Sequence, residues 1–183
     1  MKVLAHDPGG VARGTARAET ESGLVPELND GDRLPAGRER PLVLVVDDED
    51  AIRLLCRVNL SLENLDTVEA GDGDTALRLA RELKPDLVLL DVMMPQVDGW
   101  QVADELGSDD GTRELPIVFL SARAEPADYQ HAHELGAVGY VTKPFDPTTL
   151  GSALHEVLER LRRGEREELR RERLKELGEQ HET

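Results

Sequence analysis

The stretch Val43-Leu44-Val45-Val46-Asp47-Asp48 decides the fold, because a short apolar run ends there in two adjacent acids. Three later apolar runs also end in polar residues: residues 86–91 (DLVLLD) end in Asp91, residues 116–121 (PIVFLS) in Ser121, and residues 139–144 (GYVTKP) in Lys143-Pro144. Short apolar runs of this kind are typical of buried parallel strands. Because ligands bind outside the carboxyl ends of parallel strands, we expect these polar side chains to meet at one edge of a sheet.

Amphipathic segments separate the apolar runs. The spacing of apolar residues predicts helices over residues 49–62, 74–83, 99–106, 126–135 and 146–161. Strands that alternate with helices are the signature of βαβ units. The predicted fold class is therefore α/β, a doubly wound (βα)5, flavodoxin-like three-layer sandwich with a parallel sheet in the order 2-1-3-4-5.

The residues expected at this edge suit a divalent cation and a phosphoryl group. The carboxylates of Asp47, Asp48 and Asp91 would repel one another and raise at least one pKa unless a cation sat among them. Magnesium prefers oxygen ligands, so we expect Asp48 and Asp91 as direct ligands and Asp47 as a residue acting through water. Asp91 would then attack phosphorus as a carboxylate nucleophile, while Lys143 and Ser121 face the phosphoryl oxygens.

Each of these residues also has a plainer interpretation. The acids at 47–49 and the Ser121 hydroxyl are common helix caps, and Asp98-Gly99 is a common turn. Asp91 is harder to explain in this way, because it follows four apolar residues and no helix is predicted to begin before Gly99.

The order and spacing of these motifs resemble the receiver domain of bacterial two-component response regulators, over residues 41–161. The resemblance implies that Asp91 is the phosphoacceptor, assisted by Ser121 and Lys143. It also implies the cofactor Mg²⁺, held by Asp47, Asp48, Asp91 and the backbone carbonyl of Met93, which follows Asp91 by two positions.

Further roles follow only from the resemblance. Ser121 and Tyr140 would form the conformational switch, and Pro144 would follow a cis peptide bond. Met93 and Arg123 stand where the family tunes the lifetime of the acyl phosphate. Ser121 departs from the threonine more common in the family but keeps the hydroxyl.

The function expected from the resemblance is a phosphorylation-controlled signalling switch. The chain would accept a phosphoryl group from a histidine kinase or histidine phosphotransfer protein and signal to an unknown downstream protein. The expected output surface comprises the helix at 126–135, the fifth strand and the helix from Asp146. No enzymatic activity is expected beyond the chain's own phosphoryl transfer and autodephosphorylation.

Three alternative functions fit the sequence less well. A phosphorylation-independent pseudo-receiver adaptor would not need the acceptor and metal residues that are present here. A haloacid-dehalogenase-type aspartyl-phosphate phosphatase would need an acid two positions after Asp91, where the sequence has Met93. A nucleotide-binding protein would need a glycine-rich phosphate loop after a strand, and the sequence shows none.

Composition sets the expected organisation of the chain. Residues 1–40 predict a disordered tail, and residues 162–183 a charged, solvated extension that continues the last helix, so a stand-alone receiver is expected. Residues 41–159 carry 8 Lys/Arg and 24 Asp/Glu, a net charge of −16, so direct contact with nucleic acid is not expected. With a single cysteine, Cys56, and no apolar stretch near the ~20 residues of a membrane span, the expectation is a cytoplasmic protein without membrane insertion.

Overall fold

The computed structural model describes residues 38–123 and 125–179, so the predicted tail at residues 1–40 lies almost wholly outside the described residues. Five strands and six helices follow one another in this part of the chain. They are β1 (Leu42–Val46), α1 (Asp50–Leu62), β2 (Asp66–Ala70), α2 (Gly73–Leu83), β3 (Leu87–Asp91), α3 (Gly99–Ser108), β4 (Ile117–Ser121), α4 (Pro126–Glu134), β5 (Gly139–Thr142), α5 (Pro147–Arg162) and α6 (Arg166–Glu179).

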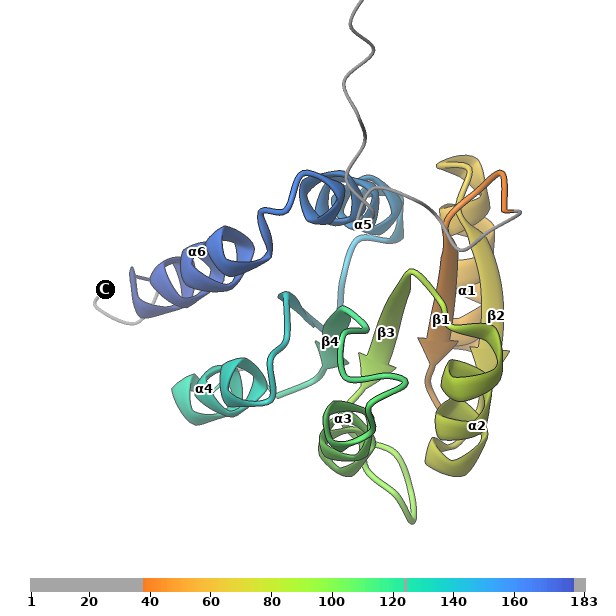
Figure 1. The fold of residues 1–183 in the computed structure, drawn as a ribbon, viewed down its shortest axis with the longest axis horizontal. Helices are drawn as coiled ribbons and strands as arrows, with labels where there is room; N and C mark the ends of the chain where they lie inside the picture. Colours follow the sequence, from red (N-terminus) through yellow and green to blue (C-terminus); the bar gives the residue numbers. More distant parts are fainter. Residues whose placement is uncertain (1–37, 124, 180–183) are drawn as a thin grey trace, which may run out of the picture.

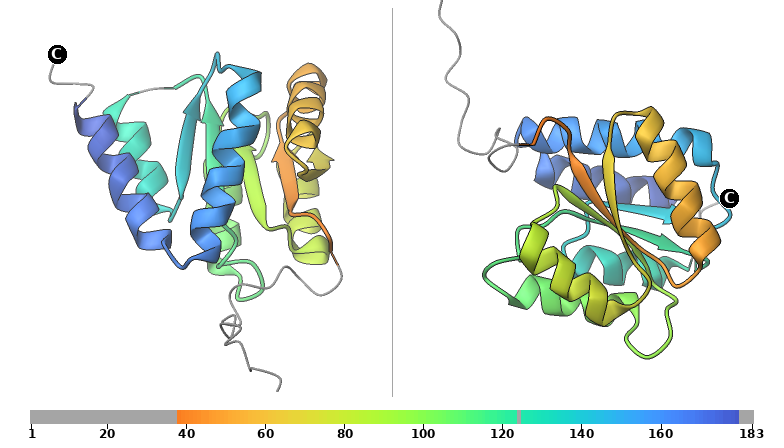
Figure 2. Two further views of the ribbon diagram at one scale, coloured as in Figure 1. Left: turned by 90° about the horizontal axis from the view of Figure 1, so that it is seen from above. Right: turned by 90° about the vertical axis from the view of Figure 1, so that its right-hand side faces the viewer.

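The strands form one parallel sheet in the order β2-β1-β3-β4-β5, which confirms the predicted topology (Figure 1). Helices cover both faces of this sheet (Figure 2). Apolar residues of α2, α3 and α4 pack on one face, around Leu44, Leu90 and Phe119. Residues of α1, α5 and α6 pack on the other, around Val43, Leu89 and Leu120. Successive side chains of a strand point to opposite faces, and both faces are covered. This explains why β1 is apolar throughout and why β3 and β4 are apolar up to their last residues, Asp91 and Ser121.

Side-chain caps fix where several helices begin. The carboxylates of Asp72, Asp98 and Asp146 accept hydrogen bonds from main-chain N–H groups in the first turns of α2, α3 and α5. The acids at the end of β1 do not act in this way, since Glu49 at the N-cap of α1 makes no side-chain cap bond. The five predicted helices agree with α1 to α5 within two residues at each end.

The C-terminal extension does not continue the last helix as the sequence predicts. α5 ends at Arg162, and Gly164 adopts a left-handed conformation (φ +77°) that turns the chain before α6 begins. α6 therefore folds back as a separate helix and contacts α4, α5 and β5 (Figure 2). Leu169 is 3% exposed and belongs to the core cluster of α1 and α5. The expectation of a continuous, solvated helix was wrong, because Gly164 interrupts the helix and Leu169 is buried against the core.

In the described part of the chain, no helix is both long enough and apolar enough to cross a membrane.

Candidate phosphoacceptor and metal site

Three carboxylates meet at the carboxyl edge of the sheet. Asp47 follows the last residue of β1, Asp48 begins the loop to α1, and Asp91 ends β3. One oxygen from each lies within 4.8 Å of the others. Asp47 and Asp91 are buried, at 0% and 2% exposure, whereas Asp48 is exposed to solvent. The parallel pairing of β1 with β3 brings the three acids together, since it aligns the two strand ends.

Lys143 supplies the positive charge at this edge. Its Nζ lies 2.7 Å from Asp47 Oδ2 and 3.3 Å from Asp91 Oδ2. Burial opposes the charge on Lys143, but the hydrogen bond to Asp47 and the two carboxylate charges outweigh it and raise the pKa of the ammonium. Burial, joined by the charge of Asp47, raises the pKa of Asp91, and Lys143 partly offsets that rise. Lys143 therefore supplies part of the positive charge that the three acids require, and the pKa of Asp91 stays raised beside it.

One oxygen of Asp91 is left without a partner. Asp91 Oδ1 is buried and accepts no hydrogen bond from the described residues, whereas Oδ2 faces Lys143. An unpartnered buried carboxylate oxygen is costly, and such a group requires an explanation. A cation bound among the three acids would supply its partner, and a set of carboxylate oxygens is the donor type that Mg²⁺ prefers. The residues present therefore fit a divalent metal ion.

Arg53 and Gly99 also shape the site, although the sequence indicated only a turn at Gly99 and no role for Arg53. The Arg53 guanidinium donates to the main-chain carbonyl of Asp47 at 2.6 Å and pairs with Glu69 at 3.6 Å, so it ties the acidic loop to β2. A methyl group added at Gly99 would clash with the Asp91 carbonyl and lie 2.8 Å from Val92 Cα. Only glycine allows this approach of α3 to the acceptor strand. An Asp-Gly pair soon after the acceptor is the one sequence signal that pointed here.

The expected switch residues are connected through the loop after β4. Ser121 is fully buried, and its Oγ accepts a hydrogen bond from the Arg123 N–H at 3.0 Å. The Tyr140 hydroxyl donates to the Arg123 carbonyl at 3.0 Å, and burial raises its pKa. Ser121 does not cap α4, whose N-cap is Glu125. The two switch residues thus share one short loop segment as their hydrogen-bond partner.

The remaining expected residues lie on the rim of the site. Met93 is 52% exposed and, with Arg123, lines an open pocket of about 390 Å³ beside the acceptor. The Arg123 side chain pairs with Asp128 at 3.9 Å. The Lys143–Pro144 peptide bond is cis, as the resemblance implies. The roles of Met93 and Arg123 in acyl-phosphate lifetime stay predictions, as does the metal contact of the Met93 carbonyl.

The fold and this edge of the sheet define a response regulator receiver. Residues 43–155 match the family described as the response regulator receiver domain, and the chain belongs to that family. Among solved structures, the chemotaxis protein CheY4 of Vibrio cholerae has a TM-score of 0.61 and 30% identity, over 64% of this chain and 98% of CheY4. The Francisella response regulator 1452 receiver domain has a TM-score of 0.62 and 29% identity, over 66% and 98%.

Curated relatives are similar over the same region. The DNA-binding response regulator MtrA of Mycolicibacterium smegmatis is 43% identical over 70% of this chain and 54% of MtrA. The alkaline phosphatase synthesis transcriptional regulatory protein PhoP of Bacillus subtilis is 41% identical over 64% of this chain and 48% of PhoP. The chain spans about half the length of the curated relatives that it matches. The expected stand-alone organisation has no support from these relatives.

The expectation of no direct contact with nucleic acid is contradicted by the same comparison. MtrA is named a DNA-binding response regulator, and the relative RpaA of Synechocystis is named a DNA-binding dual master transcriptional regulator. The expectation rested on the acidic charge of residues 41–159. Repulsion from phosphates constrains that surface alone, whereas the relatives have about as much sequence again outside the matched region.

Proposed function

We propose that this chain is a phosphorylation-controlled switch whose acceptor is Asp91. The proposal rests on the contacts of the two Asp91 carboxylate oxygens. One oxygen is held by Lys143 at 3.3 Å, and the other is buried without a partner in an acidic cluster. A carboxylate kept in this way is positioned as a nucleophile, and it lies next to a fixed positive charge for the incoming phosphoryl group.

We propose Mg²⁺ as the cofactor, held by Asp48 and Asp91 directly, by Asp47 through water, and by the Met93 carbonyl. When bound, the ion would neutralise charge on the phosphoryl oxygens. Asp47 stays fixed by Lys143 and by the Glu49 N–H, which donates to Asp47 Oδ1 at 2.9 Å. These contacts hold the acidic loop in place, and they leave exposed Asp48 as the acid most accessible to solvent.

The donor is proposed to be a phosphohistidine on a histidine kinase or a histidine phosphotransfer protein. An Asp91 carboxylate oxygen attacks phosphorus, the phosphorus–nitrogen bond breaks, and the imidazole leaves with the electron pair. Lys143 and the Ser121 hydroxyl face the phosphoryl oxygens, and later attack of water on phosphorus returns free Asp91 and phosphate. Beyond this transfer and its own dephosphorylation, no enzymatic activity is proposed.

The surface beside the acceptor supports docking of a protein donor. α1 begins just after Asp48 and exposes Leu54, Val58 and Leu62, at 49%, 50% and 75%. These residues are four apart and lie on one face of the helix. Exposed large apolar residues grouped in this way mark interaction surfaces. We propose that the donor's helices pack on this face of α1.

The output is proposed to be a shift between two states of the β4–α4 loop. Phosphorylation draws in the Ser121 hydroxyl, moves the Arg123 segment and frees the Tyr140 ring to turn inward. The expected output surface is α4, β5 and the start of α5. The relatives are named transcriptional regulators, which supports a role in gene regulation and, with it, a cytoplasmic location.

Incubation with a small phosphodonor and Mg²⁺, followed by intact mass, tests the proposal. Wild-type protein should gain one phosphoryl group, and Asp91→Asn should gain none while keeping its fold. The matched control is Asp98→Asn, which changes a carboxylate on the α3 cap and should label normally. Labelling that persists in Asp91→Asn would sink the assignment, and a wild type that never labels would favour the pseudo-receiver alternative.

Docking on α1 is tested separately. Val58→Asp should react normally with the small phosphodonor but slowly with a phosphorylated histidine phosphotransfer protein. Equal rates with the protein donor for wild type and Val58→Asp would show that α1 is not the docking face.

A further inference from the structure

α6 occupies the surface on which the proposed function places the output. Within residues 38–123 and 125–179, β5 pairs with β4 alone and is an edge strand of the sheet. α6 lies beside it and contacts both α4 and α5, so it bridges the two helices that border this edge (Figures 1 and 2). A partner that approaches α4, β5 and α5 therefore meets α6 first.

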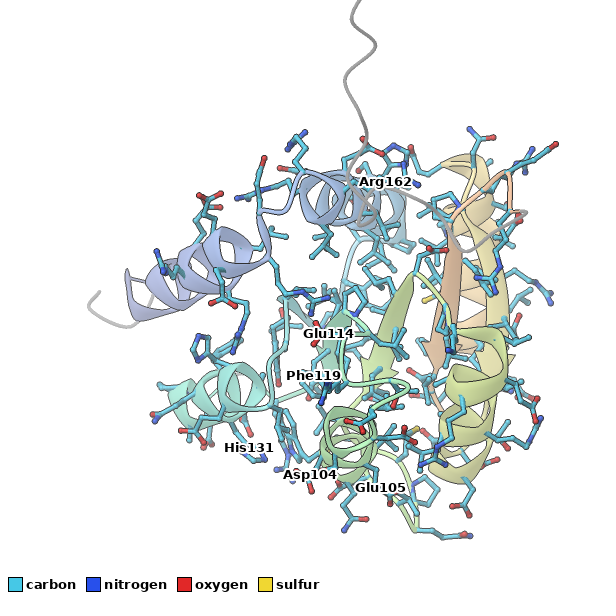
Figure 3. All side chains as sticks on the ribbon, viewed as in Figure 1. Asp104, Glu105, Glu114, Phe119, His131 and Arg162 are labelled. Atoms are coloured by element: carbon cyan, nitrogen blue, oxygen red, sulfur yellow. The ribbon has the colours of Figure 1, made fainter. Side chains whose placement is uncertain are left out.

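α6 is held by buried Leu169 and by polar contacts, among them a 2.6 Å ion pair between Arg160 of α5 and Glu172. Leu169 is the apolar anchor, and two guanidiniums flank it: Arg170 donates to the His133 carbonyl at 3.0 Å and Arg166 to the Glu114 carbonyl at 2.6 Å. Figure 3 shows Glu114 in the chain segment that leads into β4. Arg170 Nε is buried without a partner among the described residues. We call the surface that Leu169, Arg166 and Arg170 contact the seat of α6. Among the α6 side chains that the structure describes, Leu169 is the buried apolar residue, and Arg170 leaves one buried nitrogen unsatisfied. Such a seat is weaker than a fully apolar helix face.

The seat is connected to the switch through α4. The Tyr140 ring lies 4.6 Å from the Tyr129 ring of α4, centroid to centroid. His133, whose carbonyl accepts from Arg170, is in the last turn of the same helix. Movement of Tyr140 would therefore shift α4 and with it the His133 carbonyl, which is one of several groups that hold α6.

Resting on the proposed function, we propose that α6 is a built-in ligand of the output surface, and that phosphorylation releases it in favour of a partner helix of the same chemistry. The partner would carry a leucine flanked by arginines, in the pattern Arg166-x-x-Leu169-Arg170. Charge favours such a helix, because residues 41–159 carry 24 acids and 8 Lys/Arg. α6 interleaves its arginines with Glu167 and Glu168, so a helix with fewer acids would bind the same seat more tightly.

Hydrogen exchange of the full chain tests the release. Beryllofluoride with Mg²⁺ serves as the phosphoryl mimic, and the fluorescence of Trp100, which lines the pocket beside the acceptor, reports its binding. The mimic should increase exchange in α6 and along β5. Leu169→Ala and Arg170→Ala should do so without the mimic, whereas Arg171→Ala, which removes the same charge from an exposed position of α6, should match wild type.

A labelled peptide copying residues 165–179 tests the seat independently. It should bind the Leu169→Ala chain at least about tenfold more tightly than wild type, because the chain's own helix no longer competes. The same peptide with Leu169→Ala should not bind. Failure of the peptide to distinguish the two chains would overturn the proposal.

The outcomes separate the two proposals. If the mimic changes Trp100 fluorescence but leaves α6 exchange unchanged, α6 is a permanent cover of the sheet edge, and only the further inference is wrong. If the mimic does not bind, the proposed function fails, and the peptide experiment still decides whether the seat accepts a helix of this kind.

Discussion

Lys143 Nζ lies 2.7 Å from Asp47 Oδ2, so the ammonium of the β5–α5 loop neutralises a fully buried carboxylate at the end of β1. The same nitrogen reaches Asp91 at 3.3 Å. One lysine thus holds together two strand ends that are 44 residues apart in the chain. The stability of the metal-free protein and the state of the acceptor both depend on this contact.

Removal of Lys143 should destabilise the protein and make its stability depend on bound metal. Lys143→Ala leaves two buried acids uncompensated, which costs about 3 kcal/mol of unfolding free energy. Mg²⁺ should restore part of the loss, because it replaces the missing positive charge. Urea unfolding with and without Mg²⁺ measures both effects. Arg78→Ala, which breaks an exposed pair with Glu82, is the control and should change stability by less than about 1 kcal/mol.

The two adjacent acids should respond differently to removal. From the sequence alone, loss of either would relieve repulsion. The structure changes this expectation for Asp47, since Asp47→Ala removes the main partner of Lys143 and should destabilise the metal-free protein. Exposed Asp48→Ala should leave metal-free stability equal or slightly higher and weaken Mg²⁺ binding more strongly. Thermal melts and Mg²⁺ titration of both variants test this, and identical behaviour of the two would contradict the assigned geometry.

Gly99→Ala should damage the site as well as the fold. The added methyl group cannot fit against the Asp91 carbonyl, so α3 or the acceptor strand must shift. Overpacking of this kind costs about 1–3 kcal/mol, and the shift should slow labelling of Asp91. Gly107→Ala is the matched control, because a methyl group there meets no atom within 4 Å. Normal labelling of Gly99→Ala would show that the close approach does not position the acceptor.

Cys56 should be unreactive in the folded protein. Burial, with a smaller contribution from Asp47, raises the pKa of the thiol to about 12. The folded protein therefore keeps the proton at pH 8, and a thiol reagent should modify Cys56 only after denaturation. As the pH rises from 9 towards 12, the unfolded chain loses this proton first, so this group lowers the unfolding free energy. Rapid modification of the native protein at pH 8 would contradict the burial of Cys56.

Most of the fold could be predicted from local signals in the sequence. The apolar runs that end at Asp47, Asp91 and Ser121 reflect the burial of the strands. Turns and the apolar spacing of helices depend on residues close together in the sequence. These signals predict α1 to α5 within two residues of their observed ends, and a doubly wound fold of such units predicts the observed strand order. The convergence of three acids and a lysine followed from the rule that parallel strand ends share one edge.

Contacts between distant segments could not be found in this way. Three such contacts depend on distances of a few ångströms between elements. They are the pairing of Lys143 with Asp47 as its closer partner, the bond of Arg53 to the Asp47 carbonyl, and the approach of Gly99 to Asp91. Sequence spacing does not contain such distances, because they are set when all layers pack together.

The C-terminal extension shows what the sequence determines and what the tertiary structure decides. The sequence by itself determined that the segment is a charged helix, because helix propensity and charge pairs act over one or two turns. Where that helix lies was decided by the tertiary structure. Gly164 turns the chain, and one buried leucine finds a place beside β5 that exists only after the sheet and α5 have formed. Burial of an apolar side chain stabilises the protein only where a complementary apolar surface already exists. The sequence of α6 taken alone therefore predicts a solvated helix, whereas in the folded protein the same helix covers the edge of the sheet.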